Sequence, residues 1–203
     1  MATPQVLKEK PSFSNNIIVD AIEFRNIVGA LQYLTFTRPD ITHAVNRACQ
    51  HFTEPTMTNL KVVKCILGYL KGTHNWGLRY LFNTSPSLYG FSDADSVGCP
   101  ITRRSTTCYC VFIGANCISW SSKKQSIFAC SSTEAEYRSM DHTVAKLTWI
   151  TYLFHDTGVS LPRAPQLFCD NISALHMTVN LVFHACTKHI ELDCRFVSEK
   201  IAI

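Results

Sequence analysis

The chain has 203 residues, of which 46% are hydrophobic, and this suits one domain or one domain plus a smaller helical piece rather than a disordered protein. No apolar run approaches the roughly 20 residues of a membrane-spanning helix, and no signal peptide is recognisable, so we expect a reduced, intracellular protein (cytoplasmic or nuclear) without a disulfide framework. The net charge of +4 arises in residues 1–82, which carry 9 Lys and Arg against 5 Asp and Glu, whereas residues 83–203 carry 10 of each kind; this permits contact with phosphates without requiring it.

The front of the chain is predicted to be a polar lead-in followed by a small helical segment. Residues 1–20 show no periodicity, whereas within residues 21–82 apolar side chains recur with the 3.6-residue period of half-buried helices. The three predicted stripes are Ile27, Val28, Leu31 and Leu34; Ile41, Ala44, Val45, Ala48 and Phe52; and Leu60, Val63, Leu67 and Leu70. Residues 83–86 (Asn-Thr-Ser-Pro) predict a link to a second unit.

The second unit, residues 86–203, has the pattern of an α/β domain with a mixed sheet flanked by helices. The predicted strands are residues 88–93, 106–113, 117–121 and 166–170, the second and third forming a hairpin around the turn at 114–116. A long helix is predicted from Ser131, with Glu134 completing a capping box, and its apolar stripe runs to Gly158. A short helix over 171–180, with Ile172, Leu175 and Val179 inside, and a last helix from about His189 complete the expected elements.

Three carboxylates are expected to converge in this unit. Asp93 lies at the end of the first strand, Asp170 at the end of the fourth, and Glu136 on the inward face of the first turn of the long helix. If the two strands are neighbours, mutual repulsion would be costly unless cations lie between the carboxylates, and hard oxygen ligands favour Mg²⁺ or Mn²⁺. Two such ions would serve phosphodiester hydrolysis.

Each acid also has a local structural interpretation, which the residues alone leave open. In that account Asp93 belongs to a turn, Glu136 partners Thr133 in a capping box, and Asp170 is the N-cap of the next helix.

Several strings in one order resemble a known family: FRNIVGALQYLTFTRPDITHAVN, YLKGT, SDADSVGC, RRSTTCYCVFIG, ISWSSKKQ, SSTEAEYRSM, CDNISAL and VFHACTKHIELD. They resemble the ribonuclease H region of Ty1/copia-type retrotransposon polyproteins, with residues 21–82 similar to the thumb- or connection-like tail of the reverse transcriptase. The resemblance implies a ribonuclease H fold with a five-stranded sheet, and Mg²⁺-dependent hydrolysis of the RNA strand of RNA/DNA hybrids. By matching motif, Asp93, Glu136 and Asp170 take the catalytic metal-ligand positions.

The chain also departs from the family pattern. The resemblance implies a further strand and a fourth carboxylate after the KHIELD string; both are missing, so we expect a truncated sheet and impaired cleavage. Glu191 and Asp193 are possible substitutes, although a solvated helix face is the simpler interpretation. Further departures are Ser96, Cys108, Cys186 and Cys194. The polymerase aspartates are also missing, so no polymerase activity is expected.

The expected partners are an RNA/DNA hybrid and the reverse transcriptase portion of the parent polyprotein, with neither membrane nor small-molecule cofactor. The candidate nucleic-acid-binding residues flank or lie in the hairpin: Arg103, Arg104, Trp120, Lys123 and Lys124. Charges that serve solubility alone are an equally good account of the basic residues.

Three other interpretations remain open from the sequence. His184, Cys186, His189 and Cys194 resemble zinc ligands, but their spacing is irregular and the other cysteines fit small buried apolar residues. The chain is alternatively a non-catalytic nucleic-acid-binding remnant of a degenerate copia element, acting through its basic helical front. A third interpretation is that the chain is a partly folded product of a degenerate open reading frame, without function.

Overall fold

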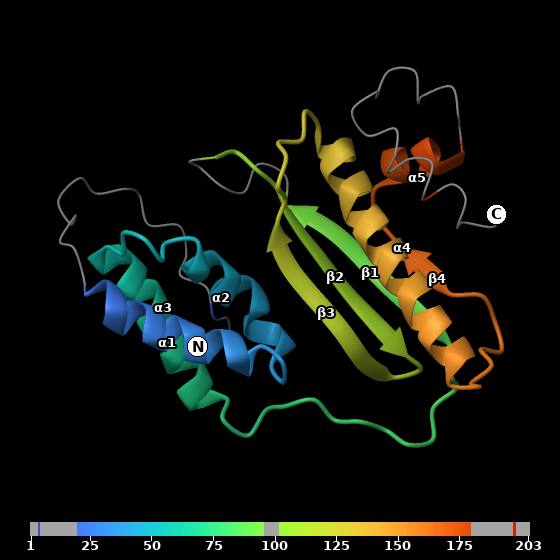
Figure 1. Cartoon of the computed structure of the whole chain (residues 1–203), viewed down its shortest axis with the longest axis horizontal. Coiled ribbons are helices and arrows are strands. Elements are labelled where there is room, and N and C mark those ends of the chain that lie inside the picture. Colours follow the sequence, from blue (N-terminus) through green and yellow to red (C-terminus); the bar gives the residue numbers. More distant parts are fainter. Residues whose placement is uncertain (1–3, 5–19, 96–101, 180–196, 198–203) are drawn as a thin grey trace. The chain divides into compact units, whose positions relative to one another are not determined.

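The computed structural model describes residue 4, residues 20–95, residues 102–179 and residue 197. The chain divides into two compact units, residues 1–78 and 79–203, and each is described by itself (Figure 1). Several sequence predictions lie outside the described residues: nearly all of the lead-in, the last helix, and those for Ser96, His184, Cys186, His189, Glu191, Asp193 and Cys194.

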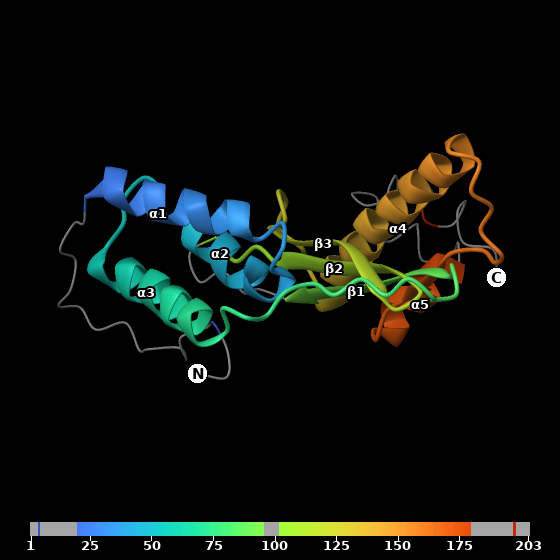
Figure 2. The same cartoon turned by 90° about the horizontal axis from the view of Figure 1, so that it is seen from below.

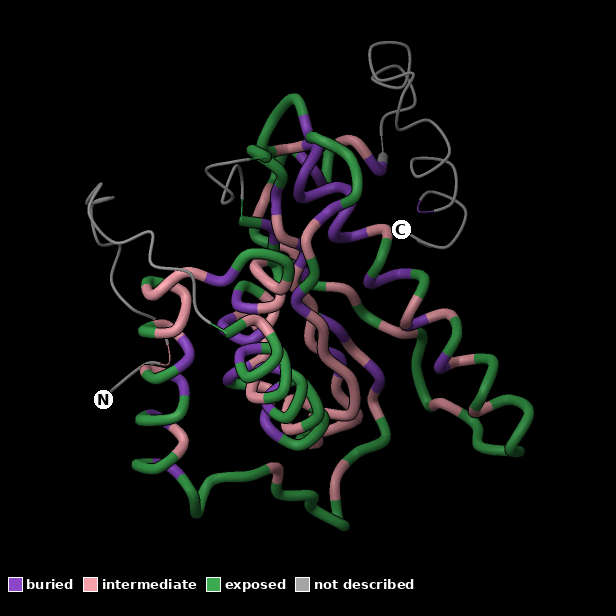
Figure 3. The backbone as a smooth tube through the Cα atoms, turned by 60° about the vertical axis from the view of Figure 1, so that its left-hand side comes forward, coloured by how far each residue is buried: buried purple, intermediate pink, exposed green. Residues whose placement is uncertain are grey.

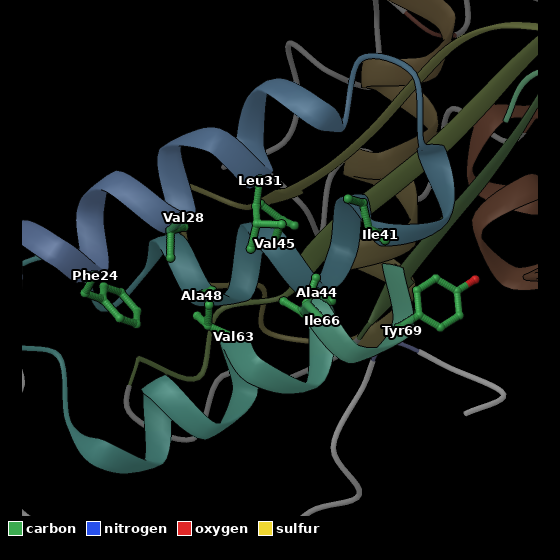
Figure 4. Close-up of a cluster of buried hydrophobic side chains, with 10 residues drawn as sticks. All are labelled: Phe24, Val28, Leu31, Ile41, Ala44, Val45, Ala48, Val63, Ile66 and Tyr69. Carbon is green, nitrogen blue, oxygen red and sulfur yellow. The ribbon is translucent and has the colours of Figure 1, made fainter. Parts of the chain in front are cut away.

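The first unit is a small helical domain with its own core. Its elements are α1 (Ala21–Leu34), the 3₁₀ turn η1 (Pro39–Ile41), α2 (Thr42–Cys49) and α3 (Met57–Gly72). Asp20 caps α1 by accepting a hydrogen bond from the Ile22 N–H at 2.8 Å. Ten buried side chains from all four elements form the core (Figure 4): Phe24, Val28, Leu31, Ile41, Ala44, Val45, Ala48, Val63, Ile66 and Tyr69.

The predicted apolar stripes hold for α1 and α2, but the stripe predicted for α3 is partly wrong. Leu67 is 42% exposed, whereas Ile66 and Tyr69 are buried. The Tyr69 hydroxyl donates a hydrogen bond to Asp40 Oδ2 at 2.9 Å, and this bond holds Tyr69 toward the η1 turn. A helix turned to satisfy that bond directs Leu67 outward.

A polar group around the buried side chain of Arg38, which we call the Arg38 cluster (Arg38, Asp40, Tyr69 and Thr73), joins the turn before α2 to the end of α3. Arg38 is 5% exposed and donates to both Asp40 carboxylate oxygens at 2.9 and 2.7 Å. It also donates to the Thr73 carbonyl oxygen at 3.0 Å and to Thr73 Oγ1 at 2.8 Å. The hydrogen bond from Arg38 lowers the pKa of Asp40, against the opposing effect of burial.

We expect Asp40→Ala to lower the free energy of unfolding of the first unit by about 2–4 kcal/mol, because it leaves a buried guanidinium short of its partner. Hydrogen exchange of the full chain should speed up in peptides from α1–α3 and stay unchanged in the second unit. Asp156→Ala, which removes an exposed contact with His155 at 3.6 Å, is the matched control and should cost no more than about 0.5 kcal/mol. Equal exchange in both variants would contradict the assigned role.

The second unit is a mixed α/β structure, which confirms the predicted fold class. Its strands are β1 (Leu88–Asp95), β2 (Thr106–Ile113), β3 (Asn116–Lys124) and β4 (Gln166–Phe168), in the order β3-β2-β1-β4. The pairs β1–β2 and β2–β3 are antiparallel, whereas β1–β4 is parallel. The helices are α4 (Ser132–Asp156) and α5 (Ile172–Val179), and α4 lies across one face of β1 and β2 (Figures 1 and 2).

The packing of α4 on β1 depends on a glycine. A Cβ atom at Gly90 would lie 3.1 Å from Thr143 Cγ2, closer than most carbon contacts, so the helix crosses the strand where no side chain intervenes. Burial alternates along β1, with Leu88, Gly90, Ser92 and Ala94 on the face that α4 covers. Along the helices, buried and exposed positions also recur, but with the longer helical period, as in α1, where Phe24, Val28 and Leu31 are buried (Figure 3).

The inward face predicted for α5 is wrong. Ile172 is 69% exposed and Leu175 is 37% exposed, whereas Ala174 is fully buried against Tyr137 and Met140 of α4. A small side chain at the contact lets the two helices approach closely, and the larger residues then turn outward.

Two further findings concern the chain as described. None of the helices among these residues combines the length and apolar character needed to cross a membrane. The described cysteines are free thiols, half-buried in most cases rather than buried as predicted, and Cys130 is exposed.

Candidate metal centre

The parallel pairing of β1 with β4 brings two acidic strand ends together. Tyr89 pairs with Gln166, Gly90 with Leu167 and Phe91 with Phe168. Asp93 and Asp170 each lie two residues beyond the last of these pairs. Continuing the same register therefore places them side by side. The prediction that the first and fourth strands are neighbours is confirmed.

Glu136 reaches the same region from α4. Its side chain is buried, with 8% exposed, and its Oε2 atom has no hydrogen-bond partner among the described residues. Burial raises the pKa of Glu136 to about 7; the charges of Asp93 and Asp170 act in the same direction, whereas a hydrogen bond from the Ala94 backbone opposes it. A buried carboxylate near two other acidic side chains is well suited to bind a cation.

The closest group of possible metal ligands is Glu136, Cys169 and Asp170. Their ligand atoms all lie within 4.8 Å of one another, with Glu136 buried, Cys169 half-buried and Asp170 exposed. Asp93 is exposed and outside this group, because it belongs to the side of β1 that alternates with the face beneath α4. The structure thus brings Glu136 and Asp170 together and leaves Asp93 at the rim.

Cys169 is the residue that the sequence analysis missed as a potential ligand. It was interpreted only as a small apolar side chain, and it does pack partly against the core of α4 and α5. Its place directly before Asp170 at a strand end was the available signal, because adjacent residues at such an end can both reach one site.

Hydrogen bonds fix the first turns of α4, and with them Glu136. Ser131 accepts from the Glu134 N–H at 3.1 Å, as the capping box predicted, and the Glu134 carboxylate accepts from the Cys130 N–H at 2.7 Å. Ser139, fully buried, donates to the Asp93 carbonyl oxygen at 2.8 Å and approaches the Cys108 carbonyl oxygen at 3.2 Å. The helix is therefore tied to the sheet one turn after Glu136.

The structure does not support the local structural roles considered for Asp93, Glu136 and Asp170. Asp93 lies within β1 rather than in a turn. The N-cap of α4 is Ser131, which removes the reason to pair Glu136 with Thr133. Asn171, not Asp170, caps α5 by accepting from the Ala174 N–H at 3.0 Å.

The basic candidate residues lie on or beside the hairpin of β2 and β3. Arg103 and Arg104 are exposed before β2, and Arg103 has a positive φ of 52°. On β3, Lys123 is exposed, whereas Trp120 and Lys124 are half-buried.

The strand register shows which of these residues share a face with Asp93. Cys108 is the partner of both Asp93 and Ser122, so Trp120 and Lys124, which lie two residues to either side of Ser122, are on the Asp93 side. Lys123 alternates to the other side. Two strand spacings, about 10 Å, separate β3 from β1.

The chain is similar to segments of much longer proteins. It is 44% identical over 202 residues to the Retrovirus-related Pol polyprotein from transposon RE1 of Arabidopsis thaliana, covering 99% of this chain and 14% of that protein. It is 32% identical over 199 residues to the corresponding polyprotein from transposon TNT 1-94 of Nicotiana tabacum, covering 98% and 14%. It is also 37% identical over 131 residues to Secreted RxLR effector protein 161 of Plasmopara viticola, covering 64% of this chain and 92% of that one. Neither a family model nor a solved structure matches the chain.

The raised pKa of Glu136 predicts a pH-dependent stability in the absence of divalent cations. Folding raises this pKa from 4.5 to about 7, so its stabilising contribution is complete below the unfolded value and is lost as the pH rises through about 7. The full shift corresponds to at most about 3.4 kcal/mol, which solvent at the exposed edge reduces. We therefore expect Glu136→Gln to raise the free energy of unfolding at pH 8 by about 1–2 kcal/mol.

Urea denaturation at pH 5 and pH 8 measures this effect, with Glu23→Gln, an exposed carboxyl on α1, as the control. The two curves for Glu136→Gln should differ less between these pH values than those of the unsubstituted chain. An unchanged pH dependence would refute the assignment.

Proposed function

Because this chain belongs to the Ty1/copia family of retrotransposon Pol polyproteins, and spans about 14% of the length of the curated relatives RE1 and RE2, we propose that its second unit has ribonuclease H chemistry. The reaction is metal-dependent hydrolysis of the RNA strand of an RNA/DNA hybrid. The first unit is then the helical tail of a reverse transcriptase, and the polymerase portion of the parent polyprotein is the expected partner.

One observation carries this proposal: the buried carboxylate of Glu136, whose Oε2 has no hydrogen-bond partner among the described residues, has an oxygen within 4.8 Å of one from Asp170, next to the end of β4. A negative charge on Glu136 is destabilised by burial and by its acidic neighbours. A cation bound there would stabilise that charge. Ligands commonly gather at the carboxyl ends of parallel strands.

The oxygen donors of Asp93, Glu136 and Asp170 suit Mg²⁺ or Mn²⁺. Such ions, when bound, would activate a water molecule and stabilise charge on the leaving oxygen of the phosphodiester. Glu136 supplies the fixed, buried ligand, because Ser131 caps its helix and Ser139 ties that helix to the Asp93 carbonyl. Asp93 and Asp170, both exposed, supply ligands that substrate can approach.

The hairpin supports the binding of a nucleic-acid backbone. Lys124 and Trp120 lie on the same side of the sheet as Asp93, at a distance that a phosphate backbone spans within a few nucleotides. Arg103 and Arg104 add exposed positive charge next to β2. The preference for a hybrid rests on the family, since recognition of 2′-hydroxyls is assigned to no residue.

We expect Asp93→Asn to reduce metal-dependent cleavage of an end-labelled RNA/DNA hybrid by about 100-fold or more, because a metal ligand is lost. Asp95→Asn is the matched control, because Asp95 is an exposed acid on the same side of the same strand, two residues away. The assay compares Mg²⁺, Mn²⁺ and chelator. Cleavage equal in Asp93→Asn and the unsubstituted chain would falsify the assignment, and hybrid binding without any cleavage would favour the non-catalytic remnant.

We also expect Lys124→Ala to weaken hybrid binding and to reduce the slope of log affinity against log salt concentration by about 1, because one phosphate contact is removed. Lys123→Ala should change the slope less, since Lys123 alternates to the other side of β3. Fluorescence anisotropy over a series of salt concentrations measures both. The reverse order of effects would assign the nucleic acid to the opposite face.

A further inference from the structure

A thiol among the carboxylates adds a ligand that ribonuclease H chemistry does not use. Cys169 Sγ lies within 4.8 Å of the carboxylate oxygens of both Glu136 and Asp170. Continuing the β1–β4 register by one residue puts Cys169 level with Ser92, on the side of the sheet that α4 covers. The thiol therefore shares a face with Glu136 rather than with Asp93.

A second feature makes this more than a cysteine beside acidic residues. Glu136 is more than nine-tenths buried, and its Oε2 atom has no hydrogen-bond partner among the described residues. One oxygen of the same carboxylate belongs to this close group of ligand atoms. Oε2 is thus buried without a hydrogen-bond partner in the part of the chain that the structure describes, and a metal ion held by the three side chains would offset the cost of burying this carboxylate.

The type of donor decides which metal fits this group. A thiolate with two carboxylates favours Zn²⁺ over the hard ions Mg²⁺ and Mn²⁺. Donor atoms around a tetrahedral Zn²⁺ lie about 3.5 Å apart, so the group would contract by at most about 1.3 Å. Rotation of the exposed Asp170 side chain supplies much of that movement.

We propose that Glu136, Cys169 and Asp170 form a zinc site whose fourth position is left to water, and that zinc bound there competes with the ions used for cleavage. Cys169 loses its proton to solvent as it binds the metal, so net charge is conserved. The inhibitory consequence rests on the ribonuclease H proposal, because zinc would hold Glu136 and Asp170 on the α4 side, away from Asp93. The binding site itself does not depend on that proposal.

Cobalt(II) is the probe for the site, because a cobalt–thiolate bond gives an intense near-ultraviolet charge-transfer band. The reduced full chain is titrated with Co²⁺, and bound cobalt is then displaced with Zn²⁺. We expect the band in the unsubstituted chain, its loss in Cys169→Ser, and at least about tenfold weaker binding in Glu136→Gln. Cys130→Ser, which removes an exposed thiol outside the group, is the control and should keep the band.

Asp93→Asn separates this inference from the proposed function. It should lose cleavage and keep the cobalt–thiolate band, because Asp93 is outside the ligand group. With Mg²⁺ present, added zinc should slow cleavage by the unsubstituted chain more than cleavage by Cys169→Ser, each compared with its own rate without zinc.

The possible outcomes are distinct. A band without cleavage would support the zinc site and contradict the ribonuclease proposal. A band that survives in Cys169→Ser, or no band from a chain with the expected circular dichroism spectrum, would overturn the zinc site whatever the cleavage assay gives.

Discussion

Parallel hydrogen bonding between β1 and β4 places two carboxyl-terminal strand ends at one edge of the second unit. The pairing is short, with three aligned residue pairs, yet the acidic site depends on it, because it aligns Asp93 and Asp170, which are distant in sequence. The third acid, Glu136, reaches the same edge because α4 crosses β1. Gly90 allows the close crossing of helix and strand, and Ser139 joins the helix to the Asp93 carbonyl.

The packing around Glu136 keeps its carboxylate buried, although burial disfavours the charged form that would bind a metal ion. The core around Tyr137 and Met140, together with the capped first turn of α4, fixes the helix, so Glu136 cannot move into water without disrupting these contacts. The pKa near 7 is the result: near neutral pH the carboxylate is about equally divided between protonated and charged forms. A metal ion would shift that balance toward the charged form.

Sequence periodicity predicted much of the fold, and the predictions that were wrong have physical causes. The alternating and 3.6-residue patterns predicted all four strands and the long helix, because burial on one face imposes them. Pattern could not predict the orientation of α3, which a tyrosine–aspartate hydrogen bond sets, or that of α5, where Ala174 rather than Ile172 makes the contact. Asp93 and Asp170 were predictable from their strands and Glu136 from the first turns of the long helix, whereas Cys169 was overlooked, since a cysteine in an apolar stretch is usually a packing residue.

The position of β3 at one edge of the described sheet has a consequence for self-association. An edge strand leaves backbone hydrogen-bonding groups open to another chain, and lysines there oppose such pairing because two copies would bring like charges together. Lys123 and Lys124 stand at the end of this strand. Variants that neutralise both, made in order to weaken contact with phosphates, would also remove a barrier to aggregation through the β3 edge.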